Sequence, residues 1–472
     1  MFLRALATLM VATACALLVY TFRPHLTWPP PRIAPRPAAA DSSKKVDAEP
    51  LTDDASARGT EGSSRIVALA AAYSHTCVAL RGGSAKCWGS NSHGELGIDP
   101  SAVRDVPYEP VGTGRYPHPM CLGPGEAATG FGISRHSICV ALASGRVKCF
   151  GASVAGLLGD SGASPAGLCG DLGDSVAAVD LGARQHALEV VSGATHQCAL
   201  LATGRVKCWG SNGYGQLGLG DLRSRGDTPH SMGDNLPFVD LGSGRTARRL
   251  SAGLAFTCAL LDDGHVKCWG RGDRLGLGST SNRGGAPGQM GDDLPPVNLG
   301  AGRLAVSLAS GPVATCAILD TGEIKCWGLA CGAMGSCDQD ATGDEPDEMG
   351  DALAPLALGT KARATALAVG MNGACALLDE HSLRCWGRNV DGELGLGDWR
   401  AHGCGGMGGA LPSVDVGPGR SVRRVAVGFG YTCVVLDSDE LKCWGWQGLA
   451  AADMPWPDRF VPMRVPPVEF GD

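Results

Sequence analysis

One short pattern, written seven times along the chain, constrains the fold more than any other feature. It consists of two cysteines ten positions apart, the second followed by an aromatic residue and a glycine, as in CALLDDGHVKCWG at 258 to 270. The first cysteines of successive copies lie 62, 59, 60, 58, 59 and 58 residues apart. A fixed period of this length predicts a repeat architecture. The pairs are Cys77 and Cys87, Cys139 and Cys149, Cys198 and Cys208, Cys258 and Cys268, Cys316 and Cys326, Cys375 and Cys385, and Cys433 and Cys443.

The residues between the two cysteines predict a hairpin. If the cysteines lie opposite each other, the loop of the fourth copy is Asp262-Asp263-Gly264, and the last position of a three-residue loop favours the left-handed region. Glycine occupies that position in the first five copies, whereas the sixth has His381 and the seventh Asp439, which are among the more tolerant residue types. The cysteine spacing and the turn chemistry therefore agree on one register.

The whole unit reads as four short strands, seen best at 296 to 328, where apolar runs alternate with turn residues. One four-stranded antiparallel sheet cannot cover both of its faces, so neighbouring units must stack, and seven units in a ring form a β-propeller. The sequence predicts an all-β fold over residues 65–472. The C-terminal VPPVEFG at 465 to 471 resembles PPVNLG at 295 to 300, so we expect it to join the first sheet and close the ring.

Cysteines that face each other across a hairpin are close to disulfide distance. Each bridge would stabilise by roughly 2 to 3 kcal/mol, and the alternative is a reduced cysteine acting as a small apolar residue. Zinc is disfavoured because only two thiols converge per unit, with no histidine at a repeated ligand spacing. Beyond the repeat, Cys331 and Cys337 frame a short loop and are expected to bridge. Cys121 and Cys169 form a weaker candidate pair, and Cys404 has no evident partner.

The first 64 residues divide into two segments. Residues 1–23 contain eighteen uncharged, mostly apolar positions and predict a signal anchor, with a cleaved signal peptide or lipidation of Cys15 as alternatives. Residues 24–64, rich in proline and then in polar residues, predict a disordered linker. Arg23, Arg32 and Arg36 outnumber Arg4 and favour a cytoplasmic propeller, whereas the cysteine pattern favours export.

Composition and motifs exclude several classes of function. A net charge of -7 argues against sequence-independent nucleic-acid binding. We find no nucleophile elbow, HExxH or paired-carboxylate signature, so no catalytic, cofactor-binding or metal-ligating residue is assigned. The histidines His75, His136 and His196 lie at or next to one repeat position and are interpreted as structural. The recurring Met-Gly-Asp loops could supply calcium ligands, but we interpret them as long turns.

The repeats resemble the regulator of chromosome condensation repeat family. The shared pattern is an apolar strand, His-Thr-Cys (residues 75 to 77), an Asp-Gly turn, Trp-Gly and then Gly-x-Leu-Gly, as in SNGYGQLGLG at 211 to 220. The resemblance covers residues 65 to 472 and implies a seven-bladed propeller. The namesake of the family is a nuclear exchange factor for the small GTPase Ran.

These observations lead to one expected function and two alternatives. We expect a non-catalytic cell-surface or exported scaffold, monomeric, that binds a protein or glycan on one propeller face and reaches a membrane through its N-terminal segment. The family resemblance supplies the first alternative, an exchange or regulatory factor for a small GTPase. The second is a hydrolase whose carboxylates lie in distant blades. The number of free thiols distinguishes an oxidising compartment from the cytoplasmic side of a membrane.

Overall fold

The structure is a computed structural model that describes residues 66–98, 117–159, 176–228, 230–329, 341–359, 362–403, 411–446 and 461–470. The chain divides into two compact units, Met1–Ser63 and Ser64–Asp472. The first unit lies outside the described residues, and so do the predicted anchor at 1–23 and linker at 24–64. Within the described ranges, no helix is long and apolar enough to cross a lipid bilayer.

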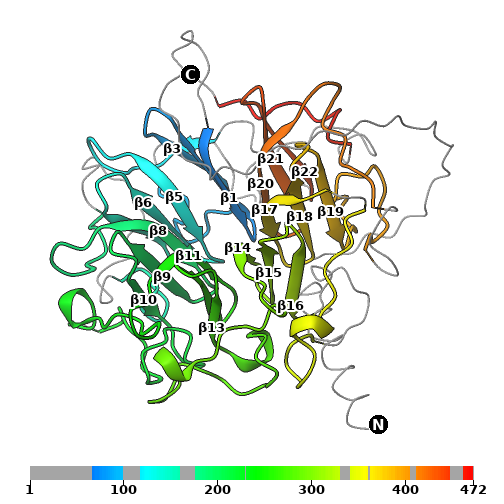
Figure 1. The fold of residues 1–472 in the computed structure, drawn as a ribbon. Coiled ribbons are helices and arrows are strands. Elements are labelled where there is room, and N and C mark those ends of the chain that lie inside the picture. Colours follow the sequence, from blue (N-terminus) through cyan, green and yellow to red (C-terminus); the bar gives the residue numbers. More distant parts are fainter. Residues whose placement is uncertain are drawn as a thin grey trace. The chain divides into compact units, whose positions relative to one another are not determined.

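Seven antiparallel sheets make up the second unit, as the repeat predicted, and each sheet is one blade (Figure 1). The innermost strands line the axis: β1 (Ile66–Ala72), β5 (Ala128–Ile133), β8 (Ala187–Ser192), β11 (Ala247–Ala252), β14 (Ala305–Ser310), β17 (Ala364–Val369) and β20 (Val422–Val427). The middle strands carry the first cysteines: β2 (His75–Leu80), β6 (Ser137–Leu142), β9 (His196–Leu201), β12 (Phe256–Leu261), β15 (Ala314–Leu319), β18 (Gly373–Leu378) and β21 (Tyr431–Leu436).

The third strand of each blade carries the second cysteine. These strands are β3 (Ala85–Gly89), β7 (Val147–Gly151), β10 (Val206–Gly210), β13 (Val266–Gly270), β16 (Ile324–Gly328), β19 (Leu383–Gly387) and β22 (Leu441–Gly445). Short 3-10 turns follow in the loops: η2 (Gly233–Asn235), η3 (Gly272–Arg274), η4 (Gly291–Asp293) and η5 (Gly350–Ala352).

The predicted hairpin register is confirmed. Cys258 pairs with Cys268 across β12 and β13, and the amide of Leu261 donates to the carbonyl of His265, which leaves Asp262, Asp263 and Gly264 as the loop. Gly264 has φ +86°, and the same left-handed conformation occurs at His381 (φ 58°) and Asp439 (φ 63°). The backbone therefore keeps one turn type even where the residue is not glycine.

The fourth strand is less regular than predicted. Over the residues that the structure describes, only the first blade has it as an assigned strand, β4 (His118–Pro119). In the other blades the described outermost segment makes a single ladder bond, such as that from the amide of Val297 to the carbonyl of Val266. The blades therefore show three or four strands.

The expected pairing of the C-terminal segment with the first sheet is wrong. The amide of Val468 donates to the carbonyl of Leu441 in β22, so the segment is the outermost strand of the seventh blade. The fourth place in the first sheet belongs to β4, which pairs with β3. The physical reason is the phase of the repeat: each outermost segment follows its own third strand along the chain, so all seven blades are contiguous in sequence.

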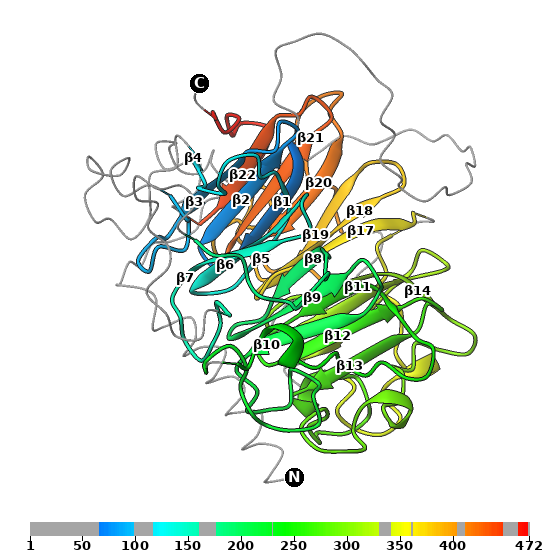
Figure 2. The same ribbon diagram turned by 90° about the vertical axis from the view of Figure 1, so that its left-hand side faces the viewer.

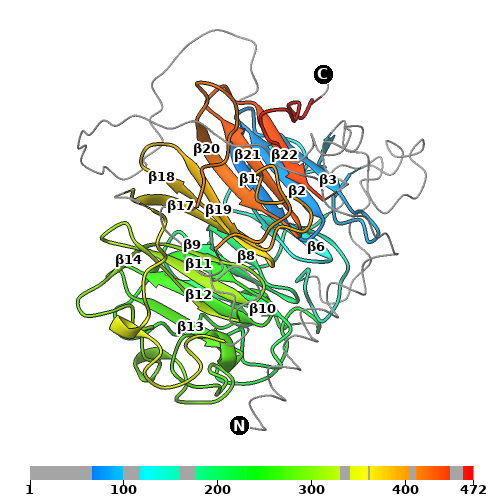
Figure 3. The same cartoon turned by 90° about the vertical axis from the view of Figure 1, so that its right-hand side faces the viewer.

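The ring closes instead through packing between complete blades. Seven hydrophobic clusters each join two neighbouring blades, and the last combines Ile66 and Val78 of the first blade with Tyr431 and Val468 of the seventh. The hydroxyl of Tyr431 donates to the carbonyl of His75 at 2.6 Å. Figures 2 and 3 show the blue first blade beside the orange seventh blade from opposite sides.

In the third, fourth and seventh blades, the tryptophan after the second cysteine donates a hydrogen bond to the preceding blade. The indole N–H of Trp269 donates to the carbonyl of Gln216 at 3.0 Å, and Trp444 bonds to Glu393 in the same way at 3.1 Å. Gly218 allows this approach, since a Cβ there would lie 2.8 Å from Nε1 of Trp269. The two sequence signatures, Trp-Gly and Gly-x-Leu-Gly, are thus the two sides of one interface.

Candidate functional site

The axis of the ring contains a cavity of about 290 Å³ to which all seven blades contribute. Its walls come from the ends of the innermost strands and the turns that follow them. Most of the lining is alanine, glycine and valine. The polar groups are Ser192, Ser251 and Ser310, and the aromatic ones are Tyr73, Phe131 and Phe429.

The chemistry of this cavity is poor in acid–base groups. Among its described lining residues, none carries a carboxylate, an imidazole or an amine. Burial raises the pKa of Tyr73 to about 12, so its phenol is neutral at ordinary pH. A mostly apolar pocket with a few hydroxyls suits binding better than proton transfer.

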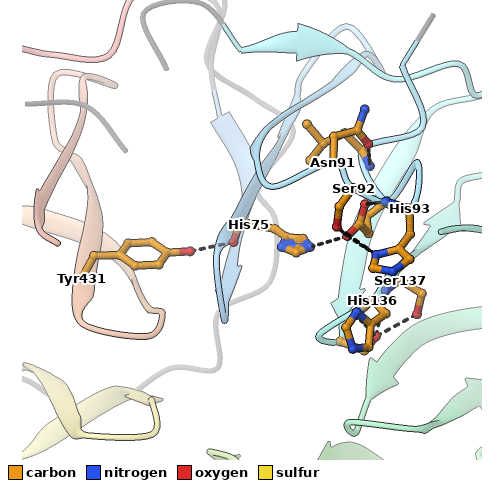
Figure 4. Close-up of polar contacts among 10 residues, drawn as sticks. His75, Asn91, Ser92, His93, His136, Ser137 and Tyr431 are labelled. Carbon is orange, nitrogen blue, oxygen red and sulfur yellow. Dashed lines mark hydrogen bonds and ion pairs between the residues drawn. The ribbon is translucent and has the colours of Figure 1, made fainter. Parts of the chain in front are cut away.

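A polar cluster lies at the interface between the first and second blades. His93 and Glu95 come from the loop after β3, and His136 comes from the turn between β5 and β6 (Figure 4). Nδ1 of His93 lies 3.2 Å from Oε1 of Glu95, and the rings of His93 and His136 have centroids 4.9 Å apart at an interplanar angle of 72°. His93 is half-exposed, whereas Glu95 is buried.

His75 lies behind this cluster and is almost fully buried. Among the described residues, neither of its ring nitrogens has a hydrogen-bond partner, and Nε2 is 3.7 Å from Oε1 of Glu95. Figure 4 shows its ring directed toward Ser92 and His93, with Tyr431 on the other side of the His75 backbone. Burial lowers the pKa of His75 to about 4, against the opposing charge of Glu95, so the ring is neutral.

The equivalent histidine of the third blade has the structural role that the sequence suggested. Nε2 of His196 lies 2.9 Å from Oγ1 of Thr257 in the next blade. His75 has no such neighbour, because Ile138 occupies the position of Thr257 in the second blade. The structural interpretation therefore holds for His196, while His75 is left with two unpaired nitrogens.

The backbone of the cluster is a turn that the repeat uses elsewhere. Oε2 of Glu95 accepts the amide of His93 at 2.7 Å, as Gln216 accepts that of Tyr214 and Glu393 that of Asp391. This contact uses only one carboxylate oxygen. Oε1 of Glu95 accepts a longer hydrogen bond from the hydroxyl of Ser92, at 3.4 Å, and faces the histidines.

The disulfide prediction agrees with the structure for all seven repeated pairs. Their Cα atoms lie 4.0 to 4.2 Å apart, and no described cysteine is free. Cys121 is also disulfide-bonded. Cys331, Cys337, Cys169 and Cys404 lie outside the described residues.

The Met-Gly-Asp loops act as turns. Oδ1 of Asp234, of Asp292 and of Asp351 each accepts a backbone amide, from Ala183, Ser243 and Ala301 respectively. These carboxylates therefore serve as acceptors for the linker that precedes the blade. These hydrogen bonds agree with our interpretation of the loops as turns. The geometry gives no support to the calcium alternative.

Sequence reasoning missed a cation that joins the blades. The ammonium of Lys207 donates to the carbonyl of Leu181 at 2.7 Å and to that of Gly233 at 2.8 Å, and Lys267 and Lys325 make the equivalent pairs of bonds. Burial lowers the pKa of each of these three lysines. A signal was available, since Lys or Arg precedes the second cysteine in all seven repeats.

Comparisons with known proteins agree with the repeat. The models of the regulator of chromosome condensation (RCC1) repeat match residues 66–95, 188–216, 248–274 and 203–260. The chain is 28% identical to the ultraviolet-B receptor UVR8 of Arabidopsis thaliana over 269 residues, 55% of this chain and 53% of the receptor. It is 40% identical to the serine/threonine-protein kinase Nek9 of Xenopus laevis over 90 residues, 19% of this chain and 9% of the kinase.

A solved structure extends the agreement to the whole ring. Yeast RCC1, crystallised with Kap60, superposes with a TM-score of 0.61 at 18% identity, covering 89% of this chain and 91% of that one. The matched region spans about half of the receptor and a small part of the kinase. The fold and its central cavity define the chain as a seven-bladed β-propeller. It contains RCC1 repeats over the residues that the family models match, and it resembles the RCC1-repeat propellers in fold.

Proposed function

We propose that this propeller is a non-catalytic scaffold that binds a protein partner on the face formed by the loops after the third strands. We call this the loop face and define it by residues 90–95, 152–156, 211–216 and 388–393. The observation that carries the proposal is a set of exposed apolar side chains at the tips of these loops. Val154, Tyr214 and Val390 are 52%, 42% and 40% exposed.

The position of these side chains supports binding. The loops leave the blades at the same end as the turns that follow the innermost strands, and those turns line the central cavity. Large apolar side chains in a ring around a concavity are typical of a protein interface. The RCC1-like relatives suggest a regulatory or binding role, and yeast RCC1 was crystallised bound to Kap60.

The disulfides support an oxidising, exported location. Seven bridged hairpins would not persist in a reducing cytosol. Thiol counting on the denatured, unreduced protein tests this location: we expect the fourteen repeat cysteines to be unreactive. Detection of most of the 20 cysteines as free thiols would remove the proposal of export.

Site-specific photocross-linking tests the binding face. A photoreactive phenylalanine analogue replaces Tyr214 or Val390 in the full chain, expressed in its native cells. Control variants carry the analogue at Ala202 or Glu380, exposed residues in hairpin turns at the opposite end of the blades. We expect a discrete protease-sensitive adduct from the loop face alone. Equal adducts from both ends, or none, would contradict the proposal, and an adduct cleaved only by glycosidases would indicate a glycan partner instead.

A further inference from the structure

The cluster of His93, Glu95 and His136 is unlike any other interface in the described part of the ring. Within that part, it is the one group of three His, Cys, Asp or Glu residues whose ligand atoms all lie within 4.8 Å of one another. We propose that these three side chains bind a divalent transition-metal ion, zinc being the best fit, between the first and second blades. This site is additional to the binding role of the loop face.

The distances suit a small cation. Four-coordinate zinc with bonds of about 2.0 to 2.2 Å holds its ligand atoms roughly 3.3 to 3.6 Å apart. Nδ1 of His93 and Oε1 of Glu95 are 3.2 Å apart. The half-exposed ring of His93 leaves a side open to solvent, so water can fill the fourth position. The three ligand atoms all lie within 4.8 Å of one another, so the ring of His136 would move toward the other two ligands on binding.

The buried neighbour His75 is a second, independent observation. An imidazole without any hydrogen-bond partner is costly in a protein interior. Its Nε2 lies 3.7 Å from the same Oε1 of Glu95 that faces His93. A carboxylate that binds metal is ordinarily held by a second hydrogen bond from behind. His75 is placed to donate that bond to Glu95.

Equivalent positions in other blades show that the fold does not require these histidines. The position of His93 is taken by Tyr214 in the third blade and by Asp391 in the sixth, and that of His136 by Ala255 and Gly430 in the blades that follow them. The same turn forms in each case. The two histidines therefore add chemistry to a turn that is stable without them.

The donor set favours transition metals over calcium or magnesium. Two imidazoles and one carboxylate suit zinc, whereas calcium and magnesium prefer sets made of oxygen atoms alone. Arg135, next to His136, brings a positive charge that opposes a cation. We therefore expect micromolar rather than nanomolar affinity. Because the ligands come from two blades, the bound ion would tie those blades together.

Titration with zinc alone tests the proposal on the full chain without a histidine tag. After treatment with a chelator and dialysis, calorimetry should give one zinc per chain. His93→Ala, His136→Ala and Glu95→Gln should each weaken binding by at least about tenfold. His265→Ala is the matched control, because Nδ1 of His265 lies 3.1 Å from Oδ2 of Asp263 in a pair without a third ligand. This control should bind zinc as the wild type does.

A second readout keeps the test sharp if a variant folds poorly. Cobalt(II) in place of zinc should give visible absorption bands of a four- or five-coordinate nitrogen and oxygen site in the wild type. His75→Gln should retain the bands, but its affinity for the ion should be lower by roughly 10-fold or more. Zinc affinity that is equal in the wild type and in His93→Ala would overturn the proposal. So would the absence of binding at 100-fold excess over the protein, or octahedral cobalt bands.

Discussion

The ammonium of Lys86 in the first blade donates a hydrogen bond to the backbone carbonyl of Phe470, 384 positions further along the chain. Lys267 makes the equivalent bond to Leu241, at 3.1 Å, between two blades that the chain also connects. The bond of Lys86 differs because no linker joins the seventh blade to the first. It is a polar closure of the ring beside the hydrophobic packing of Tyr431 and Val468.

Replacing Lys86 by methionine should loosen the C-terminal segment. The stem would still pack, but the carbonyl of Phe470 would lose its donor. We expect the amide of Val468, which donates to Leu441, to exchange its hydrogen at least about tenfold faster, corresponding to roughly 1.4 kcal/mol. Hydrogen–deuterium exchange of a peptide covering 461–470 measures this.

Lys267→Met is the matched control for the ring closure. The amide of Val239, two residues before Leu241, donates to Val206 as Val468 does to Leu441. That segment continues along the chain into β11 of the fourth blade, so its protection from exchange should change much less. If both segments lose protection equally, the missing linker has no special effect.

The disulfide of the fourth blade should contribute measurably to stability. Removing it with Cys258→Ala and Cys268→Ala frees a loop of ten positions, and we expect a loss of roughly 2 to 3 kcal/mol. Urea denaturation with the other bridges intact measures the difference. After full reduction, the free energies of unfolding of the wild type and the variant should become similar. A loss that persists unchanged after reduction would arise from side-chain packing instead.

The left-handed turn at His381 should be improved by glycine. His381 has φ 58°, a conformation that costs a residue with a Cβ about 1 kcal/mol. His381→Gly should therefore stabilise the protein by about 0.5 to 1 kcal/mol, despite the greater freedom of glycine in the unfolded chain. Gly264→Ala at φ +86° should destabilise it by about 1 to 2 kcal/mol.

Glu380→Gly is the control for this turn. Glu380 is adjacent and exposed, and its φ is not positive. Glycine there adds freedom to the unfolded state and removes the exposed carboxylate that accepts a hydrogen bond from Ser382, so the variant should be equal to the wild type or less stable. Urea midpoints for the three variants decide the matter, and a stabilised Glu380→Gly would show that turn strain is not the cause.

Glu393 should make the propeller less stable at alkaline pH. Burial raises its pKa from 4.5 to about 7, with a further contribution from the charge of Asp391. The folded state therefore favours the protonated acid, and stability falls as pH rises from 4.5 through 7. Glu393→Gln removes this dependence. The free energy of unfolding of the variant, relative to that of the wild type, should increase by at most roughly 3 kcal/mol between pH 4.5 and 8.

The third blade supplies the reciprocal control for Glu393. Gln216 occupies the same turn position and is buried, so a glutamine fits there without ionising. Gln216→Glu should destabilise the protein at pH 8 more than at pH 4.5. Chemical denaturation at the two pH values tests both variants. If the difference in free energy of unfolding between each variant and the wild type is the same at both pH values, neither carboxyl group changes its pKa on folding.

Local features were predictable because they depend on neighbouring residues. The spacing of Cys258 and Cys268 and the glycine at 264 together specified the hairpin register, since a slip of one residue would turn every side chain to the other face. The same logic placed His381 and Asp439 in the left-handed region. These predictions required no knowledge of other blades.

Contacts between repeats were harder to predict. The C-terminal segment was assigned to the first sheet because a periodic sequence can be divided into blades at any phase, and every blade edge is chemically similar. Lys86 was overlooked even though each repeat carries the same cation. The cluster of His93, Glu95 and His136 joins residues 43 positions apart that look unremarkable in separate repeats.

The sequence by itself determined the number of blades, the cysteine hairpins and the turn that places the two cysteines of each pair opposite each other. The number of blades follows from the period of 58 to 62 residues, and the hairpins follow from the local backbone preferences between the two cysteines. Only the tertiary structure decided which blade takes the C-terminal segment, which histidine has a partner and where His93 meets His136. Those outcomes depend on which residue of the next blade lies opposite, as the contrast between Ile138 and Thr257 shows.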